Sequence, residues 1–501
     1  MSDATEKERN GKTRDVRSAV IYLGQVGAAN LLPLITLPVF LNLLTTDDYG
    51  YLALATAFGA VAVGLGQFGL QQGFEREFFA RDTVQFQAGL LRSTLVLVSI
   101  TLAAVFLLSW VFRGAVAGLF LRDSDKSGFL ILVLVSQILQ AQRYYLLVFF
   151  RNRGDAAAHA LFSTAEAVLW AGFGLLFVAG LGMGVSGIPL GQIAGTALVM
   201  VPMIRHALRG AQSRWEGAAL KDAVRVGLPL TPRVLVSVAS SHLDKVLVGL
   251  IADVGGAGVY SIGQRLAYVV FSYMTALENV FVPRVLRMMF EGGDDAPERI
   301  GRYLTPFAYW SMLVAAVVTL FSYEGLLIVA PPEYLAATPI ISILVVHYSL
   351  MFFSKQRQLV FAKKTHVLSM LSVVLLVLSA ALNIPLVRAF GSVGAAAGTA
   401  TAGAIYVWLT FRLSQKYNPI SYEAGRVGII FGGLVAVTGA SLMLWWADIG
   451  LASALTIKIF LTVTFLMVGW WLRVLNRDTL HLLRSALRRV APTTPNSSGS
   501  S

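Results

Sequence analysis

Long apolar stretches recur along the whole chain, separated by short polar connections. There are fourteen of them, each about 19–26 residues long. Because an α-helix rises about 1.5 Å per residue, each stretch can cross a ~30 Å hydrocarbon layer as a helix. The predicted spans are residues 18–43, 50–73, 93–112, 129–150, 159–180, 184–204, 226–251, 257–282, 303–323, 334–354, 366–387, 391–411, 427–447 and 449–472.

This pattern predicts an all-α, polytopic membrane protein with fourteen transmembrane helices. Only helices or closed barrels satisfy the backbone in lipid, and stretches of this length exclude a barrel. The first apolar run is too long for a cleavable signal, so we expect residues 1–17 to be a polar N-terminal segment. The end of the chain, residues 473–501, is predicted to be a largely disordered tail.

Composition supports a membrane protein and excludes several kinds of chemistry. Hydrophobic residues make up 56% of the chain and charged residues only 13%, and the mean hydropathy is +0.69. A soluble domain carries about 25% charged residues, so a multidomain cytosolic enzyme is excluded. The chain has no cysteine, which excludes disulfides, thiolate metal sites and iron–sulfur clusters. It also lacks a G-x4-G-K-[ST] motif for ATP, and we expect neither a cofactor nor a metal site.

The positive charges are distributed unevenly among the connections. Of the 40 Lys and Arg residues, 31 lie in the N-terminus, the even-numbered connections and the C-terminus. Only four lie in the odd-numbered connections, and five lie inside spans. By the positive-inside rule, both termini are predicted to be cytoplasmic. The net charge of +13 then reflects topology, and no nucleic-acid partner is expected.

Two landmarks repeat at nearly the same offset. The segment from Gly50, at the start of span 2, is repeated from Gly258, at the start of span 8. Three glycines that open span 6 recur with identical spacing 207 residues later, where span 12 opens; they are Gly184, Gly187 and Gly191, and Gly391, Gly394 and Gly398. An offset of six spans keeps both halves in the same orientation, as in transporters built from parallel repeats. We therefore predict an N-lobe (18–204) and a C-lobe (226–411), with residues 427–472 outside the repeat, although small residues also recur at tight helix contacts for packing reasons alone.

Four segments carry a family resemblance. They are LPVFLNLLTTDDYGYLALA, GLGQFGLQQGFEREF, VGLPLTPRVLVSVASSHLDKVLVG and GAGVYSIGQRLA, which begin at residues 37, 64, 226 and 256. In these segments the chain resembles the polysaccharide transporter family of the multidrug/oligosaccharidyl-lipid/polysaccharide flippase superfamily, in particular Wzx-type O-antigen flippases.

The resemblance implies translocation of an undecaprenyl-diphosphate-linked oligosaccharide, an O-antigen or exopolysaccharide repeat unit, across the bacterial inner membrane. It implies two six-helix lobes that surround a cationic cavity and work by alternating access. The partners it implies are the polyprenyl-diphosphate-linked glycan and membrane lipids, with a polysaccharide polymerase and chain-length proteins as further candidates.

Charged residues inside spans are costly in lipid and are therefore candidates for function. Because arginine forks and lysine charges bind phosphate, we predict that Arg143, Arg233, Arg265 and Lys245 bind substrate. Arg233 begins a polar stripe on span 7 that continues through Ser237 and Ser240 to Asp244. The carboxylates Glu166 and Asp244 are the candidates for ion coupling.

Internal pairing is the alternative interpretation of these charges. Asp244 and Arg265 lie at similar depths in adjacent spans, and so do Arg143 and Glu166. Either pair could therefore be a purely structural ion pair. Lys458, in the last pair of spans, is expected to snorkel or pack there.

Three rival functions remain at this point. A membrane glycosyltransferase could use Asp47 and Asp48, but the outer connections are too short for an acceptor domain, and this pair is expected to cap span 2. We therefore do not expect an enzyme. A cation or drug exporter needs an acidic cavity, whereas the charges inside these spans are mainly positive. A lipid II flippase would handle the same diphosphate, and the sequence does not separate it from a polysaccharide flippase.

Overall fold

The chain folds into α-helices joined by short connections. In the computed structural model, residue 32 and residues 35–474 are described, apart from 210–213, 355–356, 363 and 448. Eleven segments in this part of the chain are helical, long and apolar enough to cross a membrane, which confirms a polytopic all-α membrane protein.

The longer helices are α2 (Thr46–Gln67), α4 (Val84–Val111), α6 (Ser127–Asn152), α7 (Ala156–Leu175), α8 (Gly187–Leu208), α10 (Thr231–Ile251), α11 (Val254–Glu291), α12 (Ala296–Leu320), α14 (Ala337–Leu350), α16 (Thr365–Tyr417), α17 (Ala424–Trp446) and α18 (Leu451–Trp471). The shorter ones are α3 (Leu70–Glu77), α5 (Arg113–Leu121), α9 (Gly217–Gly227), α13 (Ser322–Val329), α15 (Arg357–Phe361) and the 3-10 turn η5 (Pro332–Ala336).

The count of fourteen spans stays a prediction. The first predicted span lies mostly outside the described residues, of which 35–43 are helical. Helix α16 covers the predicted spans 366–387 and 391–411. Its backbone is not helical at Gly391, where φ is 55° and ψ is −134°, so the two spans are separated by a break. Helix α11 carries the predicted eighth span but is not among the eleven apolar segments.

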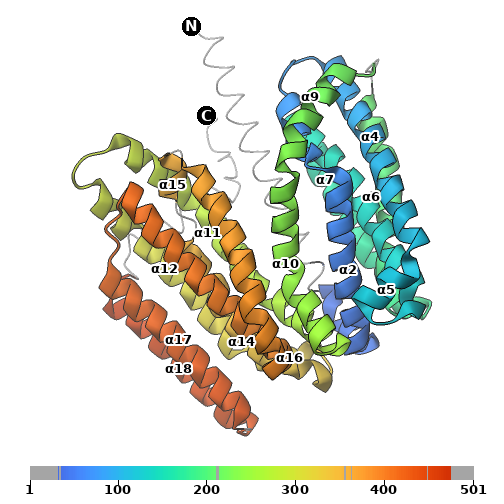
Figure 1. The fold of residues 1–501 in the computed structure, drawn as a ribbon. Coiled ribbons are helices and arrows are strands. Elements are labelled where there is room, and N and C mark those ends of the chain that lie inside the picture. Colours follow the sequence, from blue (N-terminus) through green and yellow to red (C-terminus); the bar gives the residue numbers. More distant parts are fainter. Residues whose placement is uncertain are drawn as a thin grey trace, which may run out of the picture.

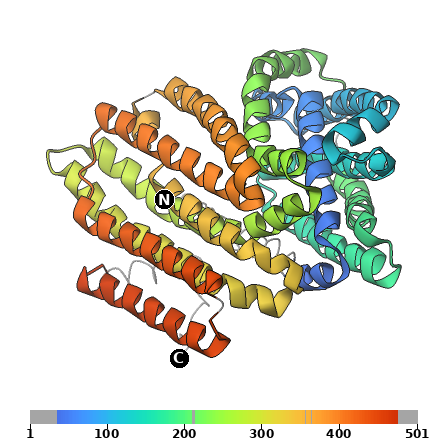
Figure 2. The same ribbon diagram turned by 60° about the horizontal axis from the view of Figure 1, so that its bottom comes forward.

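Two helical bundles lie side by side (Figure 1). Helices α2–α9 form an N-terminal bundle, and α11–α18 form a C-terminal bundle. Helix α10 stands between them and packs against both α2 and α16. The turned view in Figure 2 shows α17 and α18 as an outer layer of the C-terminal bundle, where both contact α12.

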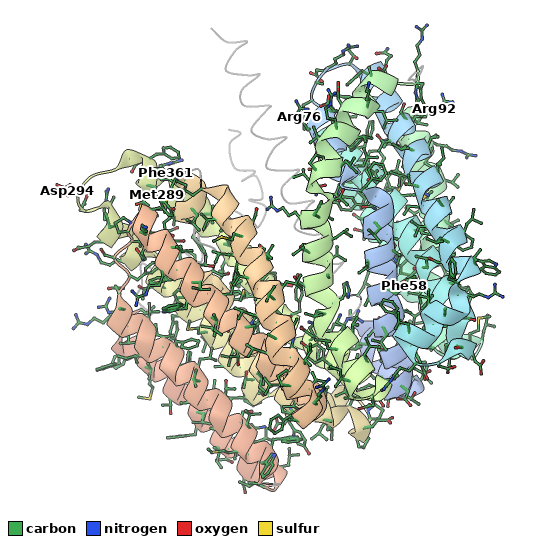
Figure 3. The ribbon with its side chains drawn as sticks, viewed as in Figure 1. Phe58, Arg76, Arg92, Met289, Asp294 and Phe361 are labelled. Carbon is green, nitrogen blue, oxygen red and sulfur yellow. The ribbon has the colours of Figure 1, made fainter. Side chains whose placement is uncertain are left out.

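Two of the basic connections lie at the same end of the molecule, one on each bundle. Figure 3 places Arg76 and Arg92 at one end of the N-terminal bundle, and Met289 and Asp294 at the same end of the C-terminal bundle. Phe58 lies well inside the N-terminal bundle, away from this end. The second and eighth connections therefore share one end, as the predicted topology requires.

Side-chain caps fix the start of corresponding helices in the two bundles. Thr45 and Asp48 form a capping box at the start of α2, in which Asp48 accepts from the Thr45 amide at 3.0 Å. Asp48 is thus used as a helix cap, as expected. Asp253 caps α11 by accepting from the Gly256 amide at 2.5 Å. Thr45 and Asp253 are 208 residues apart, so the caps follow the repeat seen in the sequence.

The repeated glycines make equivalent close contacts in two helical hairpins. Gly184 and Gly391 both have positive φ, 57° and 55°, at the turn of each hairpin. A Cβ on Gly191 would lie 2.6 Å from the Gly174 nitrogen, and one on Gly398 would lie 2.1 Å from Oδ1 of Asn383. The glycine spacing therefore reflects tight packing of α8 on α7, and of the second half of α16 on the first.

Helices α2 and α11 cross at the end opposite the basic connections. A Cβ on Gly50 would lie 1.9 Å from the Val254 carbonyl oxygen, and one on Gly258 would lie 2.8 Å from the Gly50 nitrogen. Nearby, the buried Tyr334 hydroxyl of η5 donates to the Leu44 carbonyl at 2.7 Å. These contacts join the two bundles at this end of the molecule.

Lys458 pairs with a carboxylate and does not snorkel. Its Nζ lies 2.6 Å and 2.9 Å from the two carboxylate oxygens of Glu324, beside the Tyr323 ring. The Lys458 side chain is only 5% exposed. Of the two expected outcomes, snorkelling is wrong and packing is confirmed, because Glu324 of α13 lies against α18 and pairs with the buried ammonium group.

We expect the Lys458→Met substitution to destabilise the protein by about 3–5 kcal/mol, because it leaves the Glu324 carboxylate buried without a counter-ion. The double substitution Lys458→Met with Glu324→Leu should restore much of that loss. Thermal unfolding of the purified protein in detergent measures both effects. Arg426→Ala, which breaks the more exposed pair with Glu423, is the control and should cost less than about 1 kcal/mol. Equal losses in the single and double variants would show that pairing is not the cause.

Candidate functional site

A cavity of about 400 Å³ lies within the N-terminal bundle and is bounded on one side by α11. It is lined by residues from the 35–43 segment and from α2, α6, α7 and α8. The C-terminal bundle contributes Arg265 of α11. The polar and aromatic lining residues are Thr36, Phe40, Tyr49, Thr56, Gln137, Gln140, Arg143, Ser163, Glu166, Trp170, Gln192 and Arg265.

Two predicted site residues form an ion pair in the cavity wall. The Arg143 guanidinium on α6 donates to the carboxylate of Glu166 on α7. The other Glu166 oxygen accepts from the Thr196 hydroxyl at 3.1 Å, and that hydroxyl accepts from the Trp170 indole at 3.0 Å. The Glu166 side chain is 3% exposed and that of Arg143 is 17% exposed. The pairing predicted from equal depth is confirmed, and it balances the charge of Arg143.

Amide side chains form a second polar group in the same cavity. Ser136 donates to the Gln192 carbonyl oxygen at 2.7 Å, and the Gln140 amide donates to the Ser136 hydroxyl at 3.0 Å. Gln137 lies on the same helix and packs against Gly59 of α2. Gln137 and Gln140 are three residues apart in the sequence, a spacing that places them on one face of the predicted fourth span. The sequence analysis missed Gln192 and Thr196, whose spacing of four residues on α8 was the available signal.

Arg265 is exposed in the wall of this cavity. It forms no salt bridge with any described residue, and its charge acts on Tyr49 of α2 and on Lys245 of α10. Lys245 follows Asp244 directly in the sequence, so a carboxylate accompanies it. Within the part of the chain that the structure covers, Arg265 is thus the cavity-lining cation that lacks a carboxylate partner.

Asp244 does not pair with Arg265, contrary to that alternative. Its carboxylate is buried and accepts from the Tyr260 hydroxyl at 2.8 Å and from the Asn383 amide at 2.9 Å. Equal depth did not bring Asp244 and Arg265 together, because Asp244 binds Tyr260 and Asn383, whereas Arg265 lines the cavity beside Tyr49. Asn383 had no distinguishing signal beyond being an amide in an apolar stretch.

The polar stripe on α10 is divided between different environments. Arg233 and Ser237 are exposed and do not line the cavity. Ser240 donates to the carbonyl of Val236 at 2.8 Å within its own helix. Only the far end of the stripe, at Asp244, takes part in a buried network. Among the described residues, no three His, Asp or Glu side chains gather where they could hold a metal ion.

Comparison with known proteins finds one matching family and several solved structures of similar fold. A family described as "Polysaccharide biosynthesis protein" matches residues 39–329. A solved structure of the lipid II flippase MurJ, in an inward closed conformation, is similar with a TM-score of 0.67 and 13% identity, over 90% of this chain and 99% of that one. No match is found among curated proteins.

Two multidrug transporter structures are also similar. One is a MATE family multidrug resistance transporter of the MOP superfamily in an inward-facing conformation, with a TM-score of 0.62 and 16% identity, over 82% of this chain and 98% of that one. The other is a point mutant of the Vibrio cholerae MATE transporter VcmN, with a TM-score of 0.52 and 14% identity, over 80% of this chain and 94% of that one. At these identities the likeness concerns the fold.

Proposed function

The chain belongs to the polysaccharide biosynthesis protein family, and we propose that it is a flippase for an undecaprenyl-diphosphate-linked oligosaccharide. The oligosaccharide would be an O-antigen or exopolysaccharide repeat unit, carried across the inner membrane by alternating access. The protein would move its substrate without making or breaking covalent bonds, so it is not an enzyme in this proposal.

The observation that carries the proposal is Arg265 of α11, a cation without a carboxylate partner among the described residues, at the edge of the cavity in the N-terminal bundle. A diphosphate is a strong acceptor for an arginine fork, and a charge exposed to a cavity inside the membrane needs a counter-ion. A cationic drug would be repelled there. Family membership supports a glycan substrate, and the MurJ-like fold supports a lipid carrier.

We propose different roles for the four positively charged side chains that were predicted to bind substrate. Arg265 is the principal diphosphate ligand, and Lys245 adds positive charge beside it. Arg233, exposed near the start of α10, would meet the diphosphate before it reaches the cavity. Arg143 reaches substrate only when Glu166 releases it, because the two are paired in this structure.

We propose Glu166 as the first candidate for ion coupling and Asp244 as the second. A proton on Glu166 would break its pairing with Arg143 and change the charge of the cavity wall. Asp244 is bound by Tyr260 and Asn383 and does not line that cavity. It is therefore the second candidate.

The proposed orientation places both termini and the basic connections in the cytoplasm. The crossing of α2 and α11 then closes the periplasmic end. A polysaccharide polymerase and chain-length proteins are the expected partners on that side, where the translocated repeat unit would be used.

Flipping in vesicles tests the proposed function. The purified full chain in liposomes should move a fluorescent undecaprenyl-diphosphate-linked oligosaccharide between leaflets, and empty liposomes should not. Lipid II and a cationic dye are the comparison substrates. If lipid II moves faster than the oligosaccharide carrier, the substrate is a cell-wall precursor and the polysaccharide assignment is wrong. Transport of the dye without movement of either lipid would overturn the flippase assignment.

A further inference from the structure

We propose that the cavity of the N-terminal bundle binds an uncharged sugar ring of the substrate, which Gln137, Gln140 and Gln192 recognise. The diphosphate stays at the edge of the cavity, on Arg265. This inference rests on the proposed function and adds a specificity site to it. The cavity volume of about 400 Å³ falls within the roughly 300–1,000 Å³ of small-molecule pockets. It suits part of a glycan head group, not a whole lipid-linked oligosaccharide.

The amides present unused hydrogen-bonding groups to the cavity. Gln140 and Gln192 use one polar atom each, because the Gln140 nitrogen donates and the Gln192 oxygen accepts. The Gln140 carbonyl, the Gln192 amide nitrogen and both polar atoms of Gln137 have no hydrogen-bond partner among the described residues. All three side chains are partly exposed where they line the cavity. Hydroxyl groups both donate and accept, so a sugar can satisfy this mixture of donors and acceptors.

The internal bonds hold these groups in place before a ligand arrives. Ser136 is buried and bridges Gln192 and Gln140, whose nitrogen is also 3.3 Å from the Gln192 oxygen. Two of the three amides are thus fixed through bonds between α6 and α8. A site that is held in its binding geometry loses less conformational entropy when it binds.

Trp170 supplies an aromatic wall next to the amides. Its indole nitrogen is anchored on Thr196 at 3.0 Å, and Arg143 lies 5.8 Å from its ring centroid. The negative face of an aromatic ring attracts weakly positive C–H groups, such as those of a pyranose ring. Amides beside an anchored tryptophan therefore fit the two surfaces of a sugar, its hydroxyl edge and its C–H face.

The charge balance excludes other occupants. Glu166 neutralises Arg143, so the interior of the cavity has no net charge, and among the described lining residues Arg265 alone is positive at its boundary. A diphosphate held inside would be left without counter-ions, and its desolvation is costly. A polyprenyl chain would leave the unused polar atoms of the three amides without partners, which is also unfavourable. An uncharged polyhydroxyl group needs no counter-ion and supplies hydrogen-bond partners to the amides, so it fits this cavity.

Binding of carriers with and without sugar tests this assignment. Undecaprenyl diphosphate alone, and the same carrier bearing one glucose, one galactose or one N-acetylglucosamine, are measured on the purified full chain. We expect at least one sugar-bearing carrier to bind more tightly than the bare carrier. The double variant Gln140→Leu with Gln192→Leu should weaken its binding about tenfold or more and leave the bare carrier unchanged. Gln72→Leu, at an exposed position on α3, is the matched control.

A second variant keeps the test decisive if the leucine substitutions unfold the protein. Ala171→Leu adds bulk to the cavity wall without removing a polar group, and it should have the same selective effect. The assignment is overturned if no sugar improves binding, or if the variants weaken the bare carrier equally or change nothing. If the wild type binds neither carrier, the proposed function fails instead.

Discussion

Replacing Arg265 by alanine is expected to abolish flipping of the lipid-linked oligosaccharide while the protein remains folded and inserted. The side chain is exposed to the cavity and has no carboxylate partner among the described residues, so its removal leaves no buried charge behind. A charge-assisted bond to phosphate contributes roughly 1.5–3 kcal/mol, so binding of undecaprenyl diphosphate should weaken about 10–100-fold. Flipping in vesicles and equilibrium binding measure the two effects.

Two substitutions separate this role from general damage. Arg265→Lys keeps the charge but loses the fork and should recover binding only in part. Arg302→Ala removes a surface arginine that pairs with Glu298 in its own helix, and it should leave flipping unchanged. An Arg265→Ala variant that binds undecaprenyl diphosphate as the wild type does would remove Arg265 from the site.

Arg143 illustrates why the structure was needed to rank the cations. In the sequence, Arg143 and Arg265 are equivalent single charges in apolar spans. In the structure, Arg143→Ala would leave the Glu166 carboxylate buried and unpaired, which costs about 3–5 kcal/mol. Loss of activity in that variant would therefore reflect stability as much as binding. Arg265 is the cleaner test because no described residue pairs with it.

The fold followed largely from local sequence signals. Apolar length predicts helices in lipid, and the caps and glycines lie next to the contacts that they serve. Gly184 and Gly391 illustrate this, because both have positive φ at the turn of a hairpin. The span count could not be checked at the N-terminus, where residues 1–31 and 33–34 lie outside the described residues.

The candidate site could be predicted only in part, because sequence spacing does not say which faces of neighbouring helices contact each other. Equal depth correctly paired Arg143 with Glu166 and wrongly suggested a pair of Asp244 with Arg265. Depth follows from residue counts, whereas the neighbour of a helix face depends on how whole helices pack. Asn383, 139 residues from Asp244, occupies the position that Arg265 was thought to fill. No local pattern contains that information.

Substituting alanine for Gly258 is expected to open the end of the molecule where α2 and α11 cross. The added Cβ would lie 2.0 Å from the Thr46 carbonyl oxygen, which belongs to the backbone of α2 and cannot rotate away, so the two helices must move apart. Gly50→Ala should act in the same way through its 1.9 Å approach to the Val254 carbonyl. The proposed alternating access requires this end to close, so both variants should lose directional flipping.

The chain has no cysteine, so a single Thr56→Cys substitution in the cavity gives labelling without background. In intact cells, a membrane-impermeant thiol reagent added from the periplasmic side should label this cysteine several-fold faster when Gly258→Ala is present. Gly325→Ala, which adds a Cβ that meets nothing within 4 Å, is the matched control and should not change the rate. Tyr334→Phe removes only the hydrogen bond to Leu44 across the bundles, and its labelling rate should be intermediate. If Gly258→Ala is labelled no faster than its parent and still flips substrate, this crossing does not control access to the cavity. The cavity would then have to be closed by other contacts.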